Sequence, residues 1–159
     1  MIEVSYAGTD KLILSAIEAA VERVGPAVAT ALDAKDAEMV GWIQGEELHG
    51  QILNQRTGKL AGSIRFIPAR QEGTSIIAQV EGAGGTAFYG NIFETGGSGP
   101  FDIYPVNKQA LWWEGAPHPV RHVRHPGIPS KPFMAPALQH FTPELVAAVE
   151  TAIAEALGG

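Results

Sequence analysis

The feature that most constrains the fold is a helical apolar pattern at each end of the chain, with a glycine- and proline-rich centre between them. After Asp10, apolar residues recur at steps of three and four, which places them on one face of a helix. Thr9 can cap the start of this helix, and Asp10 suits its positive end. The stripe consists of Ile13, Ile17, Ala20, Val21, Val24, Val28 and Leu32.

Further helical segments are expected on both sides of the centre. Gly25-Pro26 predicts a kink or a break in the first helix, because proline lacks a backbone donor and crowds the carbonyl of Glu22. A second helical stretch is predicted from about Asp36 to Leu53, although it contains three glycines. Near the end, Thr142-Pro143-Glu144 combines a cap, a first-turn proline and a first-turn acid, and predicts a helix over residues 142–157.

Two short alternating runs in the centre predict a β-hairpin. Residues 60–68 and 75–81 read as strands, and Arg70-Gln71-Glu72-Gly73 reads as the turn between them. Leu60, Ile64 and Phe66 would then share one strand face and be buried together. Gly58 should take a positive φ where the chain leaves the helical region.

The segment from Gly96 to Lys131 is rich in glycine, proline, histidine and tryptophan, so it predicts a long loop with little regular structure. Short strands are expected over residues 101–104 and 110–113, and Gly96-Gly97 permits a tight reversal. Three prolines between Arg124 and Pro132 fix φ and exclude a helix, so this stretch should run extended.

Together these elements predict an α+β fold. A small antiparallel β-sheet should pack against the N-terminal and C-terminal helices, with long Pro/Gly-rich loops outside it. The 159 residues suit a single domain, made of a helical region over 10–55, a β-hairpin and loop region over 57–134, and a C-terminal helix over 142–157.

Composition excludes several classes of function. Eleven basic against 17 acidic residues give a net charge of −6, which is unsuited to a general nucleic-acid coat. The absence of cysteine excludes disulfides and Cys-ligated zinc. No run of 18 apolar residues is present, so no membrane span is expected, and the first residues lack the pattern of a signal peptide.

Catalytic and metal sites find little support. His118, His122 and His125 would share a face only on a helix, which the neighbouring prolines disfavour, and no acid lies between Gly115 and Phe141 to complete a ligand set. None of the serines has the G-x-S-x-G context of a hydrolase, and the Gly82–Gly85 segment lacks the lysine of a phosphate-binding loop. We therefore expect no enzyme activity, no cofactor and no bound metal.

Four motifs follow one another in a fixed order. They are TGKLAGSI over residues 57–64, FYGNIFETG over 88–96, YPVNKQALWW over 104–113, and HPGIPSKPFMAPAL over 125–138. In order and spacing they resemble the small neck and tail-component family of tailed bacteriophages, which includes tail-completion and head–tail joining proteins. The resemblance covers roughly residues 10–157. The aromatic and histidine content of residues 104–125 exceeds what the family pattern leads one to expect.

The resemblance implies a structural virion protein without catalysis, made in the host cytoplasm and located at the neck or tail of the particle. It implies a homo-oligomeric ring, sixfold or twelvefold with a hexamer as the expected form, that contacts adjacent neck, adaptor and tail proteins. DNA would pass through the lumen without being read. A tail terminator or another minor tail protein is the alternative, and a ligand- or metal-binding module is a third possibility.

Candidate interface residues come from the aromatic, basic and proline-stiffened parts of the loop region. Phe133 and Met134 follow the extended stretch, where they would anchor it to a partner or pack in the domain's own core. Arg121 and Arg124 belong to a basic patch that would face a negatively charged partner, the lumen DNA or simply water. The full set is Glu94, Trp112, Trp113, Arg121, Arg124, His125, Lys131, Phe133 and Met134.

Overall fold

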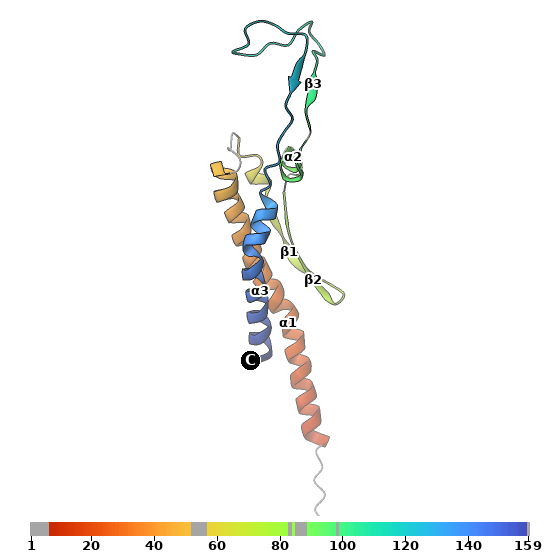
Figure 1. The fold of residues 1–159 in the computed structure, drawn as a ribbon. Helices are drawn as coiled ribbons and strands as arrows, with labels where there is room; N and C mark the ends of the chain where they lie inside the picture. The colour runs from red at the N-terminus through yellow and green to blue at the C-terminus, as the bar shows by residue number, and fades with distance from the viewer. Residues whose placement is uncertain (1–6, 52–56, 83, 85–88, 98, 159) are drawn as a thin grey trace, which may run out of the picture.

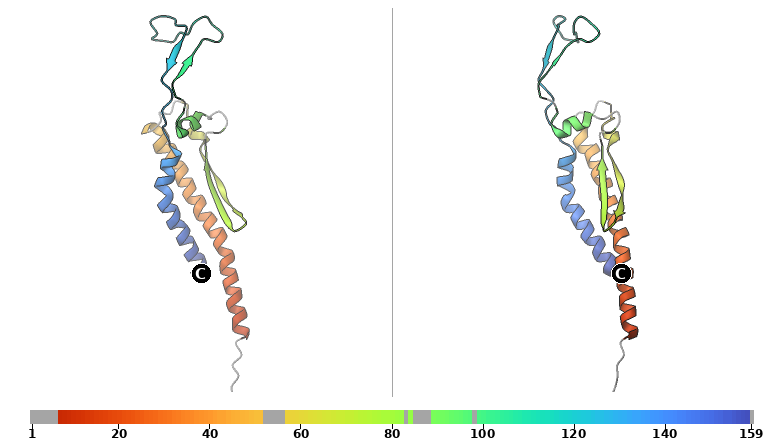
Figure 2. Two further views of the ribbon diagram at one scale, coloured as in Figure 1. Left: turned by 45° about the vertical axis from the view of Figure 1, so that its right-hand side comes forward. Right: turned by 90° about the vertical axis from the view of Figure 1, so that its right-hand side faces the viewer.

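The computed structural model describes residues 7–51, 57–82, 84, 89–97 and 99–158. Two long helices run side by side, and a β-hairpin lies along the first of them (Figure 1). A second, smaller hairpin extends away from one end of the helix pair (Figure 2). The fold class is therefore α+β, as predicted, with two antiparallel two-stranded sheets in the described part of the chain.

The two long helices, α1 (Ala7–Trp42) and α3 (Met134–Gly158), run antiparallel. Lys35 of α1 pairs with Glu144 at 3.1 Å, and nearer the other end the Arg23 guanidinium donates to the carbonyl of Ala156 at 3.0 Å. This register brings α3 to its end beside the middle of α1. The first turns of α1 consequently project past α3 (Figure 2).

Of the kink or break predicted at Gly25-Pro26, the break is wrong, because α1 continues through Pro26 without interruption. The proline removes one backbone hydrogen bond, but helix packing against α3 extends on both sides of it and Val28 is buried two residues later. Tertiary packing thus outweighs the local cost of the proline. The second predicted helix joins the first. The joined helix ends at Trp42 and is followed by π-helical turns in η1 (Ile43–Gln51), which are interrupted where Gly50 has φ 112°. The predicted end at Leu53 lies outside the described residues.

The hairpin consists of β1 (Arg65–Glu72) and β2 (Ser75–Glu81), with Phe66 opposite Val80. The register shifts between Ile67 and Arg70, at a bulge that contains Pro68. The free N–H of Ala69 in this bulge donates to the Asp33 carboxylate of α1 at 2.6 Å. The hairpin was predicted, but its first strand begins five residues later than expected and its turn is confined to Gly73 and Thr74.

Residues 60–64 are not the start of a strand. A short 3₁₀ helix, η2 (Ala61–Ser63), follows Gly58, whose φ of 70° fits the predicted role of this glycine. Leu60 and Ile64 are buried as expected, whereas Phe66 remains partly exposed. The helical turn explains the difference, since residues 60–64 do not follow the period-two alternation that would have placed Phe66 on one face with Leu60 and Ile64.

The core lies where the end of α1, η1, η2 and the start of α3 meet. The predicted start of the last helix at residue 142 is wrong, because α3 begins at Met134 and Pro143 lies within it. Phe141 is buried and the His140 ring stacks on Trp42 with centroids 5.0 Å apart, so packing on α1 stabilises the helix across Pro143. The buried cluster comprises Met39, Ile43, Leu48, Leu60, Ala61, Ile64, Phe133, Ala137 and Phe141.

Gly82 packs so closely on this core that its substitution gives a clear test. A Cβ at Gly82 would overlap Cδ1 of Ile64, whose side chain is enclosed by the core. We expect Gly82→Ala to lower the free energy of unfolding by about 1–3 kcal/mol, because overpacking displaces buried side chains. Urea denaturation measures the change.

The matched control is Gly41→Ala, at a helical position where a Cβ meets no atom within 4 Å. This substitution should raise the free energy of unfolding by about 1 kcal/mol, since alanine is the better helix former. Equal effects of the two substitutions would contradict the packing described for Gly82.

Candidate subunit interface

Glu94 joins the loop region to the last helix. It lies in α2 (Tyr89–Thr95), and its carboxylate accepts three backbone hydrogen bonds. The N–H groups of Phe133 and Met134 donate to Oε2 at 2.7 and 2.9 Å, and that of Ala135 donates to Oε1 at 2.9 Å. The negative charge also suits the positive end of the helix dipole. Glu94 therefore caps α3 from a distant part of the chain and forms no ion pair among the described residues.

The two ends of the loop region meet at α2. The Lys131 N–H donates to the carbonyl of Phe93 at 2.8 Å. Gly96 and Gly97 have φ of 98° and 58°, which confirms the predicted reversal after Glu94. A Cβ on Gly97 would overlap the carbonyl oxygen of Ile128, so only glycine permits this close crossing.

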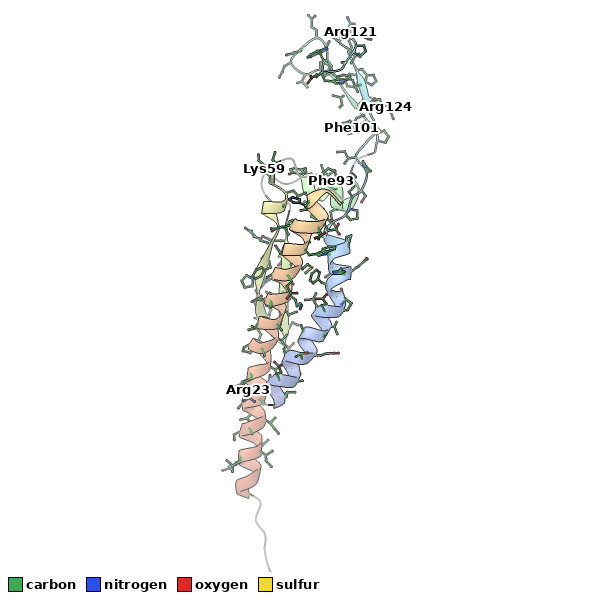
Figure 3. All side chains as sticks on the ribbon, turned by 90° about the vertical axis from the view of Figure 1, so that its left-hand side faces the viewer. Arg23, Lys59, Phe93, Phe101, Arg121 and Arg124 are labelled. Carbon is green, nitrogen blue, oxygen red and sulfur yellow. The ribbon has the colours of Figure 1, made fainter. Side chains whose placement is uncertain are left out.

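Beyond this crossing the chain forms a long projection that we call the arm, residues 99–131. Its stem is the sheet of β3 (Phe101–Ile103) and β4 (Val123–His125), in which Asp102 lies opposite Arg124. A further antiparallel bridge joins Leu111 to Val120, with N–H to O distances of 2.8 and 3.0 Å. The arm runs from Phe93 at its base, past Phe101 and Arg124, to Arg121 at its far end (Figure 3).

Side chains pair along the stem of the arm. The Asp102 carboxylate contacts His122 Nε2 at 2.7 Å and the Arg124 guanidinium at 3.2 Å. The His125 ring stacks on Phe101 with centroids 4.7 Å apart, and its Nδ1 accepts a hydrogen bond from the Gly127 N–H. Arg124 and His125, both candidate interface residues, therefore have partners within the arm.

The far part of the arm exposes large apolar side chains. Trp112 is 66% and Val106 93% exposed, and Trp113 is exposed as well. The predicted strand over residues 110–113 is reduced to the bridge at Leu111. Both tryptophans are therefore exposed, and neither belongs to the buried core of the described residues.

The nine candidate residues fall into two groups. Trp112, Trp113, Arg121, Arg124 and His125 belong to the arm, and Lys131 lies exposed at its base. Phe133 is only 1% exposed and belongs to the chain's own core, so it cannot anchor a partner. Met134 is partly buried against the same core, and Glu94 caps α3.

Sequence reasoning missed Asp36, a buried carboxylate on the core side of α1. Asp36 is only 3% exposed, and its Oδ2 has no hydrogen-bond partner among the described residues. Burial raises the pKa of this carboxyl, and the nearby Asp33 carboxylate raises it further. A signal was present in the sequence, since Leu32, Asp36, Met39 and Ile43 follow one another at helical spacing and only one of them is polar.

The described residues contain neither a metal site nor a membrane-spanning helix. No group of three or more His, Cys, Asp or Glu side chains could hold a metal ion there. Within the same ranges, no helix is long and apolar enough to cross a membrane. Comparison with models of known protein families, with curated proteins and with solved structures gives no match to this chain.

The cap on α3 predicts a cost for neutralising Glu94. In Glu94→Gln, the amide replaces one acceptor oxygen by a donor that faces a backbone N–H. We expect a loss of about 1–3 kcal/mol in the free energy of unfolding, measured by urea denaturation. Glu155→Gln, at an exposed position of α3, is the control and should change stability by less than about 0.5 kcal/mol. An unchanged stability of Glu94→Gln would show that the cap is not needed.

The burial of Asp36 should make the stability of the fold depend on pH. Its pKa is raised in the folded chain, so the folded state binds the proton more tightly than the unfolded state does. The stability that this carboxyl contributes is therefore greatest at low pH and is lost as pH rises through the folded-state pKa. Asp36→Asn should make the chain more stable than the wild type at pH 7, and the difference should shrink as pH falls towards the ordinary carboxyl range. A difference that grows on acidification in urea denaturation would contradict this assignment.

Proposed function

We propose that this protein is a structural subunit of a tailed bacteriophage, which acts without catalysis as a ring at the junction of head and tail. The proposal rests first on the order of the four motifs, TGKLAGSI, FYGNIFETG, YPVNKQALWW and HPGIPSKPFMAPAL. The single structural observation that supports it most is the arm, whose exposed tryptophans have no core of their own to enter.

The arm has little stability of its own without a surface to pack against. A two-stranded hairpin is marginally stable alone in water, and the β3–β4 stem is a hairpin of this kind that extends clear of the helices (Figure 2). Tryptophan is enriched in interface hot spots because it buries a large area and loses little entropy. A neighbouring subunit or virion protein would supply the surface that the arm lacks, at roughly 1,600 Å² of total buried area for a stable contact.

The projecting turns of α1 support an assembly role independently of the arm. Leu12, Ile13 and Ile17 are more than half exposed there. Ile13 and Ile17 lie on the apolar stripe that continues to Val28, which is buried where α3 runs alongside α1. A contiguous apolar face without a covering element is typical of a protein interaction surface. The molecule therefore exposes apolar side chains at both of its far ends, on the arm and on the first turns of α1.

Loss of the protein from the particle tests the proposed function. A stop codon at Lys11 in the phage genome should give filled heads and complete tails that do not join, as seen by electron microscopy of the lysate. Tails of uncontrolled length would favour the alternative of a tail terminator. Normal, infectious particles would overturn the proposal, and a melting temperature raised by a metal ion would favour the third possibility, a metal-binding module.

The exposed tryptophans should matter for assembly and not for folding. We expect Trp112→Ser with Trp113→Ser to leave the melting temperature within about 2 °C of the wild type, since surface substitutions change stability little. The double variant should fail to restore infectious particles when supplied to the stop-codon phage.

The control for the tryptophan variant is Val146→Ser with Leu157→Ser, which removes two exposed apolar side chains from α3. These substitutions should allow complementation. If the tryptophan variant also restores a normal titre, the arm tip has no part in joining.

A further inference from the structure

A groove runs along the body of the molecule between α1, β2 and α3. Its volume is about 650 Å³, and most of its lining is apolar. Asp36 lies among these apolar side chains with one oxygen unpartnered. The residues that line the groove include Leu32, Asp36, Met39, Ile76, Leu138 and Leu145.

A buried, unpartnered carboxylate in an apolar groove favours one kind of occupant. Such a group is costly unless it is protonated or receives a hydrogen bond from a cation. Leu138 is more than half exposed although it lines the groove, so the groove opens to the outside. The fitting ligand would carry apolar side chains together with an arginine or lysine.

The arm of the same chain has this chemistry. The arm carries four basic residues and two acids, Asp102 and Glu114, which gives it a net charge of +2. Since the whole chain has a net charge of −6, the rest of the chain has a net charge of −8. Within the arm, Arg124 is paired with Asp102, whereas Lys108 and Arg121 have no ion pair among the described residues. Both of these free cations accompany the exposed Trp112 and Val106 in the far part of the arm.

We infer that the far part of the arm docks in the Asp36 groove of a second copy of this chain, with Arg121 or Lys108 supplying the cation that Asp36 lacks. The arm leads away from its own groove, so the contact is intermolecular (Figures 1 and 3). Charge supports this pairing over the others, because arm meets body with opposite net charge, whereas two arms or two bodies repel.

This contact joins two different surfaces, an arm and a groove, so every copy offers one of each. Such heterologous contacts propagate, and they close into a ring when the rotation between copies allows it. The inference rests on the self-association part of the proposed function and adds the surfaces that would make it. It does not depend on which part of a virion the ring occupies.

The test is a double-mutant cycle on the full-length chain, read by sedimentation velocity over a range of concentrations. Asp36→Asn and the pair Lys108→Gln with Arg121→Gln should each weaken self-association by about tenfold or more. Combining all three substitutions should add little further, since both changes remove the same contact. Lys59→Gln with Arg70→Gln removes the same charge at exposed positions of the body, outside the groove and the projecting turns of α1, and should leave association unchanged.

Thermal melting separates this role from a structural one. Asp36→Asn should fold and be at least as stable as the wild type at pH 7, so that its weaker association cannot be ascribed to unfolding. A wild-type chain that stays monomeric at every concentration would overturn the inference and remove the ring from the proposed function. A wild-type oligomer insensitive to both sets of substitutions would overturn the arm–groove contact and leave the proposed ring standing.

Discussion

The first N–H groups of a helix have no carbonyl partner within the helix. At the start of α3, the Glu94 carboxylate accepts hydrogen bonds from three such groups. Glu94 is in contact with Phe133, Met134 and Ala135, some forty positions further along the chain, so it closes the whole arm into one loop. The same closure sets the start of α3 and thereby the register of α3 on α1. With the register fixed, Phe133 enters the core, the arm leaves the body, and the first turns of α1 remain uncovered.

Much of the fold could be predicted because its signals are local. Apolar spacing predicted a helical region at each end, and strand alternation predicted the β1–β2 hairpin. Gly58, Gly96 and Gly97 were identified as positions of positive φ from the turns around them. These features depend on neighbours within a few residues, which a sequence displays directly.

The errors arise where distant contacts decide the outcome. Pro26 and Pro143 predicted a break and a helix start, yet both lie inside helices whose packing on one another outweighs a lost hydrogen bond. The start of α3 at Met134 depends on Glu94, and nothing in the local sequence from Phe133 onward indicates a cap from another segment. Likewise, Asp36 was visible as a polar residue in an apolar stripe, but its burial depends on the hairpin and α3 closing around it.

Several charged and apolar groups are left in unfavourable surroundings when the chain folds alone. Among the described residues, a monomer has no donor for the buried Oδ2 of Asp36, and it leaves Trp112 and Ile17 in water. Each of these features disfavours the isolated chain, and each is relieved by a partner that brings a cation or an apolar face. Groups that destabilise the monomer and stabilise a complex both increase the free-energy difference between these two states. That free-energy difference sets the association constant. In the proposed assembly, part of the interaction energy would therefore come from surfaces that folding alone does not satisfy.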